Sequence, residues 1–195
     1  MEKLEQKFLG EQKISKLLLK FSIPCVLSLM INALYNIVDT IFIGNSSLGE
    51  SGVAATGVVF PLFVITQAFA WCFGDGTAAY LNICQGKGDS KNASKIIGTG
   101  ITATVIVAVL LISFLLPFRR EILFFMGASG ENIDLSQEYL EIIVVSFPFY
   151  MLAEMLVCIV RADGSPAWSM FSMVTGAIIN IVLDPIFIMV LDMGM

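Results

Sequence analysis

The sequence predicts an all-helical integral membrane protein with about five spanning helices. The 195-residue chain is 57% hydrophobic, and its mean hydropathy of +0.87 is too high for a soluble domain. A helix of about 20 apolar residues crosses the hydrocarbon core of a bilayer, and the chain holds several such runs. Its basic residues gather on one side of these runs, as they do in multi-pass membrane proteins.

Five apolar segments qualify as membrane-spanning helices. In chain order they cover roughly 17–43, 53–84, 96–117, 137–160 and 167–191. The third is the clearest, because no charged residue lies between Ile96 and Phe118. The second is long enough to be tilted or to project beyond the bilayer. We expect part of 127–137 to be helical, and the tight turn 161–166 to make the fourth and fifth helices antiparallel neighbours.

The distribution of basic residues predicts the orientation of the chain. With the N-terminus in the cytoplasm, all 11 Lys and Arg residues except Arg119 and Arg120 lie on the cytoplasmic side. Residues 1–16 are expected to form a cytoplasmic amphipathic segment at the membrane surface, ahead of a transmembrane unit over 17–195. An odd number of spans that ends in MVLDMGM, without a soluble tail, favours a piece of a longer chain.

The composition does not favour an enzyme. The sequence contains no histidine, which removes the commonest general base and metal ligand. All 4 cysteines lie within predicted spans and form no CxxC pair, so they are interpreted as small apolar packing residues.

Four carboxylates lie inside or at the edge of the apolar runs, and they are the main functional signal. They are Asp39, Asp75, Glu154 and Asp184. A charged side chain at the centre of a bilayer costs about 2.5–3.5 kcal/mol even on the mildest scale. Such residues usually handle ions, protons or cationic ligands, so these four are candidate functional residues.

The first span places a polar stripe on one helical face. Asn32, Asn36 and Asp39 follow the spacing i, i+4 and i+7, and Tyr35 lies close to the same face. Pro24 removes one backbone donor early in the span, which predicts a bend. A seam of hydrogen bonds between helices would explain the asparagines, but it explains a carboxylate poorly.

The fifth span repeats this pattern. Asn180 and Asp184 are spaced i, i+4, and Pro185 disturbs the helix directly after the carboxylate. Broken helices offer free carbonyl oxygens, from which transporters build sites for Na⁺ or protons. Asp39 lies roughly 33 Å and Asp184 roughly 26 Å along outward-running helices, so both fall in the outer half. Such a pair would bind a shared proton or a Na⁺ ion, and the sequence leaves both open.

The other two carboxylates and Tyr139 carry weaker signals. Asp75 lies between Gly74 and Gly76, where it marks either a hydrated bend or a functional position. Glu154 is a candidate lining residue of a cavity that attracts cations. Tyr139 begins the fourth span and is either a cavity residue or an interfacial anchor.

Longer stretches of the sequence resemble a known family. The run SIPCVLSLMINALYNIVDTIFIG (Ser22–Gly44) resembles the first helix of the multidrug and toxic compound extrusion (MATE) family. The resemblance continues over essentially the whole chain, in the family's order and spacing. It includes VAATGVVFPLF (Val53–Phe63), the QGKGD loop, RADGSP and NIVLDPIFI (Asn180–Ile188).

The resemblance implies a fold and an activity. Family members have twelve helices in two six-helix lobes and exchange cationic or aromatic compounds for Na⁺ or H⁺. This chain would be the N-terminal lobe, cut before its sixth helix and without its partner lobe. It would lie in the plasma or inner membrane and bind small organic cations but no nucleic acid. It would need no cofactor besides the coupling ion.

The resemblance also assigns roles to individual residues. Asp39 matches the family's acid in the first helix, Asn180 and Asp184 match its partners in the fifth, and Pro24 matches the bending proline. Pro185 would be a second hinge. The candidates for the substrate cavity are Tyr35, Asn36, Asn32, Tyr139 and Glu154.

Two other functions fit the sequence less well. A flippase of lipid-linked sugars, from the same superfamily, needs Arg or Lys to hold phosphates, and the predicted spans hold basic residues only near their ends. An intramembrane aspartyl protease needs a GxGD motif, but Cys72 replaces its first glycine before Asp75, and no Tyr directly precedes Asp39.

Overall fold

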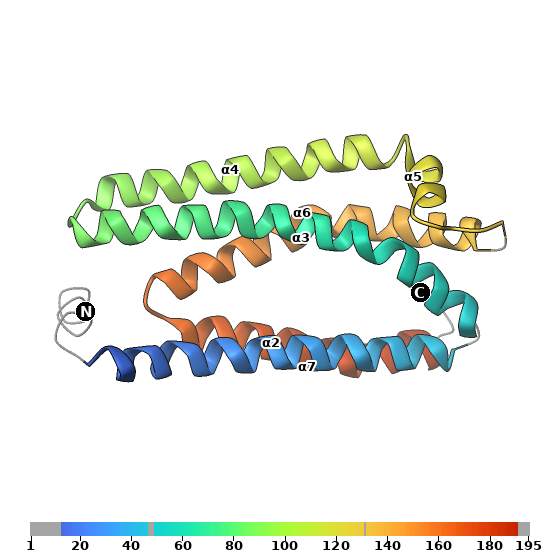
Figure 1. The fold of residues 1–195 in the computed structure, drawn as a ribbon, viewed down its shortest axis with the longest axis horizontal. Coiled ribbons are helices and arrows are strands. Elements are labelled where there is room, and N and C mark those ends of the chain that lie inside the picture. The colour runs from blue at the N-terminus through green and yellow to red at the C-terminus, as the bar shows by residue number, and fades with distance from the viewer. Residues whose placement is uncertain (1–12, 47–48, 131, 191–195) are drawn as a thin grey trace.

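The computed structural model describes residues 13–46, 49–130 and 132–190, and this part of the chain is helical without any strand (Figure 1). The elements, in chain order, are α2 (Ile14–Gly44), α3 (Gly49–Gly86), α4 (Ser90–Leu115), α5 (Arg119–Phe125), α6 (Ile133–Ala162), α7 (Pro166–Pro185) and the π-helix η1 (Ile186–Val190). The expected amphipathic segment falls mainly on residues 1–12, which lie outside the described residues, and it stays a prediction.

Five of these helices are long and apolar enough to cross a membrane, which confirms the predicted fold class. They are α2, α3, α4, α6 and the combined stretch Pro166–Ile188, with mean hydropathies of 1.9 to 2.4 over their most apolar windows. We call the end of the bundle that carries Arg119 outer and the end that carries Lys87 inner, following the orientation predicted from charge. The spans alternate in direction, so α2, α4 and α7 run outward while α3 and α6 run inward.

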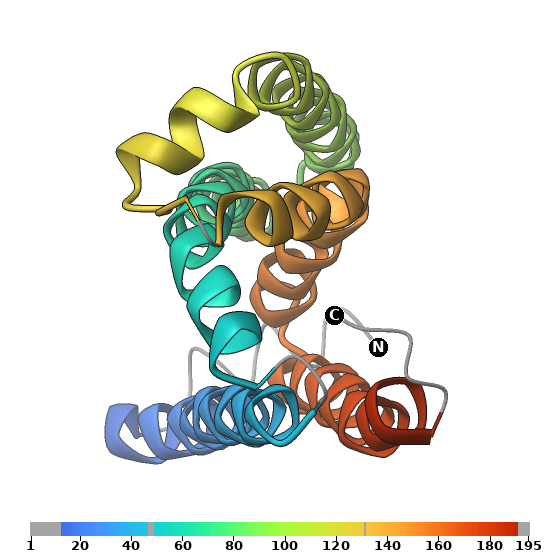
Figure 2. The same ribbon diagram turned by 90° about the vertical axis from the view of Figure 1, so that its right-hand side faces the viewer.

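The helices form three layers, which are clearest in the end-on view of Figure 2. One layer is α4 with α5, the central layer is α3 with α6, and the third is α2 with α7. The central pair makes the most extensive contacts in the molecule, and α4 packs on both of its members. Its apolar core includes Val59, Leu62, Leu140, Val144 and Phe147.

Glycines allow the central helices and α4 to approach closely around Met155. A Cβ atom added to Gly74 would lie 3.2 Å from the Met155 Cα, and one added to Gly100 would lie 2.5 Å from the Met155 Cε. The Thr104 hydroxyl donates to the Met155 sulfur at 3.1 Å. Three helices therefore meet at one buried methionine, in a contact that only small residues permit.

The layer of α2 and α7 differs from the predicted arrangement. Gly164, at φ +84°, closes the turn between α6 and α7, and the two helices run antiparallel as expected. Beyond the turn they diverge (Figure 1), and α7 packs mainly along α2 rather than along α6. The expectation that the fourth and fifth helices are close neighbours therefore holds only near the turn.

The outer connection between α4 and α6 contains a helix that the sequence analysis missed. The third span ends at Leu115, and α5 follows at Arg119–Phe125. Leu123 of α5 is fully buried, and the Arg119 Nε lies 2.8 Å from a Glu141 carboxylate oxygen on α6. A short helix therefore covers the outer end of the core.

Candidate functional site

The polar stripe on α2 forms as predicted. The Asn36 side-chain amide donates to the backbone carbonyl of Asn32 at 2.8 Å and to its side-chain oxygen at 3.1 Å. One turn further outward, the Thr40 hydroxyl donates to the Asn36 carbonyl at 2.8 Å. Tyr35 lies beside both asparagines. The helix also continues through Pro24, whose carbonyl accepts a bond from the Ser28 hydroxyl, so the expected bend stays a prediction.

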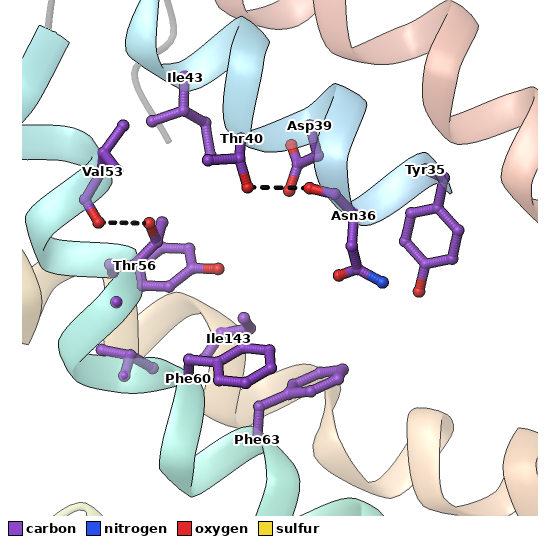
Figure 3. A pocket seen from close by; sticks show the side chains of 13 residues that line it. Tyr35, Asn36, Asp39, Thr40, Ile43, Val53, Thr56, Phe60, Phe63 and Ile143 are labelled. Atoms are coloured by element: carbon purple, nitrogen blue, oxygen red, sulfur yellow. Dashed lines mark hydrogen bonds between the residues drawn. The ribbon is translucent and has the colours of Figure 1, made fainter. Parts of the chain in front are cut away.

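A cavity of about 410 Å³ opens between α2, α3 and α6. Its α2 wall is polar and includes Tyr35, Asn36 and Asp39, whereas its α3 wall is largely apolar and aromatic. Figure 3 shows Tyr35 and Asn36 directed toward Phe60 and Phe63. The cavity is lined by Tyr35, Asn36, Asp39, Thr40, Ile43, Val53, Thr56, Gly57, Val59, Phe60, Phe63, Tyr139 and Ile143.

Asp39 and Asp184 belong to the adjacent helices α2 and α7, and their carboxylates are close enough to interact electrostatically. The Asn180 amide donates to one Asp184 oxygen at 2.9 Å. Within the described part of the chain, Asn180 Oδ1 and Asp184 Oδ2 are buried and accept no hydrogen bond. These two buried oxygen atoms, which accept no hydrogen bond in the described structure, lie on the helix next to a second carboxylate. Such an arrangement can bind a proton or a small cation.

The backbone changes character directly after this site. Helix α7 ends at Pro185, which has no N–H to donate, and the chain continues as the π-helix Ile186–Val190. Short π-helical stretches often mark functional sites. The predicted irregularity at Pro185 is therefore present, although Asp184 itself remains α-helical.

The site offers oxygen donors. Among the residues that the structure describes, no cluster of three or more His, Cys, Asp or Glu side chains could hold a metal ion. Two carboxylates and an amide oxygen are hard ligands, which favour alkali or alkaline-earth cations and protons over soft transition metals.

The remaining candidate residues divide between the cavity and a group nearer the inner end of α6. Tyr139 lines the cavity, but Asn32 and Glu154 do not. Glu154 lies roughly 22 Å further along α6 than Tyr139 at 1.5 Å per residue, toward the inner end. There it accepts a hydrogen bond from the Trp71 indole at 2.9 Å. Asp75, one turn beyond Trp71, neighbours the Cys158 thiol.

Tyr150, one turn outward from Glu154 on α6, neighbours both Glu154 and Gln67. Sequence reasoning missed Trp71 and Tyr150 as members of this inner group. Both are amphipathic aromatic residues inside apolar runs, where they are hard to distinguish from packing residues. One signal was available, because Trp71 and Asp75 are spaced i, i+4 and share a helical face.

A bundle of membrane-length helices with a carboxylate in the wall of its cavity is typical of membrane transporters. Comparison with known families agrees. The MatE family model matches residues 24–186, and the chain belongs to this family of MATE multidrug efflux transporters. It is a multi-pass protein of the cell membrane.

Individual relatives give the extent of the match. Multidrug export protein MepA of Staphylococcus haemolyticus is 31% identical over 184 residues, covering 93% of this chain and 40% of that protein. MepA of Staphylococcus aureus (strain NCTC 8325 / PS 47) is 30% identical over 192 residues, covering 97% of this chain and 42% of that protein. The chain thus spans about two fifths of the length of these relatives.

Solved structures show the same fold. A MATE crystal structure in complex with MaD3S superposes with a TM-score of 0.84 at 30% identity, covering 91% of this chain and 39% of that one. A MATE structure in a bent conformation also gives 0.84 at 30% identity, covering 92% and 40%. A transporter of the MOP superfamily from Pyrococcus furiosus, described as having a binding pocket of reverse polarity that suggests a different function, gives 0.83 at 30% identity, covering 91% and 39%.

Proposed function

We propose that this chain is the N-terminal lobe of a multidrug efflux transporter that exchanges cationic or aromatic organic compounds for Na⁺ or protons. The observation that carries the proposal is the pair Asp39 and Asp184, with buried oxygens of Asn180 and Asp184 that accept no hydrogen bond in the described structure. A buried site with spare acceptors and adjacent carboxylates binds a positive charge more readily than it stays empty. The partner lobe would complete the transport pathway.

In the mechanism we propose, ion binding changes the shape of the cavity. A Na⁺ ion or proton at Asp39 and Asp184 removes the repulsion between their carboxylates and lets α2 bend near Pro24. Because α2 forms the polar wall of the 410 Å³ cavity, its movement would weaken substrate binding and release the substrate outward. Loss of the ion to the inside then resets the carrier. MATE crystal structures are described in a straight and in a bent conformation, which supports a transport cycle with two shapes.

A lipid-linked cargo fits the site less well. None of the residues that line the cavity is basic, and Asp39 gives it a negative charge. A phosphate-bearing substrate would be repelled there. The fold alone does not decide the cargo, because a relative of the same fold is described as having the opposite pocket polarity. The charge of this particular cavity therefore favours cationic compounds.

Gradient-driven efflux tests the proposal. The complete open reading frame that encodes this chain would be reconstituted in vesicles, and efflux of ethidium would be followed under an imposed Na⁺ or pH gradient. We expect one gradient to drive efflux, and Asp39→Asn to abolish it while membrane insertion stays normal. Asp134→Asn, which changes an exposed carboxylate at the outer end of α6, is the matched control. Efflux that persists in Asp39→Asn would overturn the site assignment.

A further inference from the structure

Helices α3 and α6 share a ladder of polar pairs that the proposed function does not use. Both helices run inward, and the Trp71–Glu154 hydrogen bond joins residues that are 83 positions apart. The same offset pairs Gln67 with Tyr150, one turn outward. It also pairs Asp75 with Cys158, one turn inward. The two helices are therefore in parallel register, with one polar pair at each turn.

The middle pair combines a carboxylate with aromatic rings. Glu154 is half-buried within a span, and its hydrogen-bonding partner Trp71 carries no charge. The Trp71 indole donates to one of its oxygens and leaves 42% of the Trp71 side chain exposed. A carboxylate that lacks a cationic partner in a low-dielectric region is costly, and a bound cation would offset that cost.

The neighbours of Glu154 suit an organic cation better than a metal ion. The Tyr150 ring lies one turn outward and stacks on Phe63, with 4.4 Å between ring centroids. Aromatic faces attract quaternary and aromatic cations through their quadrupoles, and tryptophan does so most strongly. Na⁺ is bound instead by several oxygen ligands, and the buried oxygens without a hydrogen bond in the described structure include those of Asn180 and Asp184 but none of Glu154.

Tyr35 connects this inner position to the outer acids. It lies within electrostatic range of both Glu154 and Asp39. It also lines the outer cavity, together with Phe63. Glu154 is roughly 12 Å from the inner end of α6 at 1.5 Å per residue, so it is closer to the cytoplasm than the outer acids are. A cation bound at Glu154 would therefore interact electrostatically with Tyr35, although it would not occupy the Asp39–Asp184 pair.

We propose that Trp71 and Glu154 form a binding site for aromatic or quaternary organic cations, separate from the Asp39–Asp184 pair and on its inner side. This inference rests on the proposed function for its substrate class and adds the position at which that substrate first binds. Trp71 would contribute the ring face, Glu154 the charge, and Tyr150 the outer wall.

Equilibrium binding of radiolabelled tetraphenylphosphonium to the intact transporter in lipid nanodiscs tests this site without any ion gradient. We expect Glu154→Gln to weaken binding at least tenfold, because the amide keeps an acceptor for the indole but loses the charge. Trp71→Phe should weaken it several-fold. Glu138→Gln, an exposed carboxylate on the same helix, is the control and should bind like the wild type. The neutral analogue triphenylphosphine oxide should bind Glu154→Gln and wild type equally, which separates lost charge from a collapsed site.

A second readout uses Trp71 itself. In a version whose single tryptophan is Trp71, with Trp168→Phe and any others replaced, tetraphenylphosphonium should change the fluorescence, and Glu154→Gln should abolish the change at the same concentration. Wild-type affinity in Glu154→Gln would overturn the inference. So would loss of binding in Asp39→Asn with full binding in Glu154→Gln, because the cation would then occupy the outer pair.

The two proposals fail in different ways. Normal efflux in Asp39→Asn with binding lost in Glu154→Gln would remove the coupling proposal and keep the inner cation site. Abolished efflux in Asp39→Asn with unchanged binding in Glu154→Gln would do the reverse.

Discussion

The packed unit of α3, α4 and α6 and the pair of α2 and α7 are built in opposite ways. Helix α3 has eleven buried residues and α6 has nine, and they surround the contacts at Gly74, Gly100 and Met155. Helix α2 has two buried residues, Ser28 and Ile43, although it is 31 residues long. Helix α7 has three. Apolar packing therefore concentrates in one unit of the molecule.

The second unit carries the groups proposed for ion coupling instead. Asn36, Asp39, Asn180 and Asp184 all lie on α2 or α7, and buried oxygens of Asn180 and Asp184 lack partners in the described structure. A densely packed unit resists deformation, whereas helices with few buried contacts move at lower cost. We therefore call the unit of α3, α4 and α6 the scaffold and propose that the α2 and α7 pair is an ion sensor. In this proposal an ion bound at the pair shifts α2 while the scaffold keeps its shape.

The largest expected effect comes from a substitution that adds a side chain at the tightest helix contact of the scaffold. Gly100→Leu would force a side chain into Thr77 and Met155, where even a Cβ atom is too close. Overpacking a core typically costs about 1–3 kcal/mol, and a whole leucine at a helix contact belongs at or beyond the upper end. We expect Gly100→Leu to reduce the yield of folded protein strongly, as measured by gel filtration of the detergent-solubilised protein.

Gly98→Leu is the matched control for that experiment. It lies on the same helix, two residues away, and a Cβ atom there meets nothing within 4 Å. It should fold like the wild type. Equal yields of the two variants would contradict the view that α4 is part of a rigid scaffold.

A smaller effect is expected in the sensor and depends on the ion. Binding of a ligand at 100 times its Kd stabilises the bound form by about 2.7 kcal/mol. If Na⁺ bridges Asp39 and Asp184, then Na⁺ in place of choline should slow hydrogen exchange in α2 and α7 but leave α3 and α6 unchanged. If the ligand is a proton, acidification should give the same protection after correction for intrinsic exchange rates.

Asp184→Asn should remove that protection, because the amide can neither bind the proton nor supply the charge for Na⁺. Asp134→Asn should retain it. Protection that spreads equally over all five spanning helices would contradict the proposed distinction between scaffold and sensor. Protection absent under both conditions would refute the ion site.

The overall fold was accessible from the sequence because the bilayer limits the choices. A chain with five long apolar runs and a one-sided distribution of charge can satisfy its backbone hydrogen bonds only as spanning helices. The pairing of Asp39 with Asp184 is predicted from their similar distances along two outward-running helices, and it stays a prediction.

The sequence did not predict which helices pack against each other. The turn at Gly164 constrains only the first residues of α7, and nothing in its sequence specifies α2 rather than α6 as its main partner. The same limit hid the Trp71–Glu154 bond, because the 83-residue offset between α3 and α6 depends on long-range packing. The short helix α5 was missed because seven residues carry too little periodicity to be detected.

The smallest expected effect lies at the inner edge of the scaffold, where Asp89 caps α4. Its carboxylate accepts the backbone N–H of Asn92 at 3.1 Å and the Asn92 side-chain amide at 2.6 Å. Both hydrogen bonds lower the pKa of Asp89 from its ordinary value of 3.8, and the bond from the Asn92 backbone has the larger effect. The cap therefore stabilises the helix start fully above that value, and its contribution disappears as the pH falls through the lowered pKa.

Acidification should thus reduce the exchange protection of the Asn92 amide, after correction for the intrinsic rate, without affecting the interior of α4. Asp89→Asn should keep the cap, because asparagine is an equally good N-cap residue, and should make the protection independent of pH. A pH effect that survives in Asp89→Asn would assign the titration to another group. A pH effect that extended from Asn92 into α3 and α6 would show that the scaffold opens as one body with its inner turn, and the mobile part of the molecule would then be larger than the α2 and α7 pair.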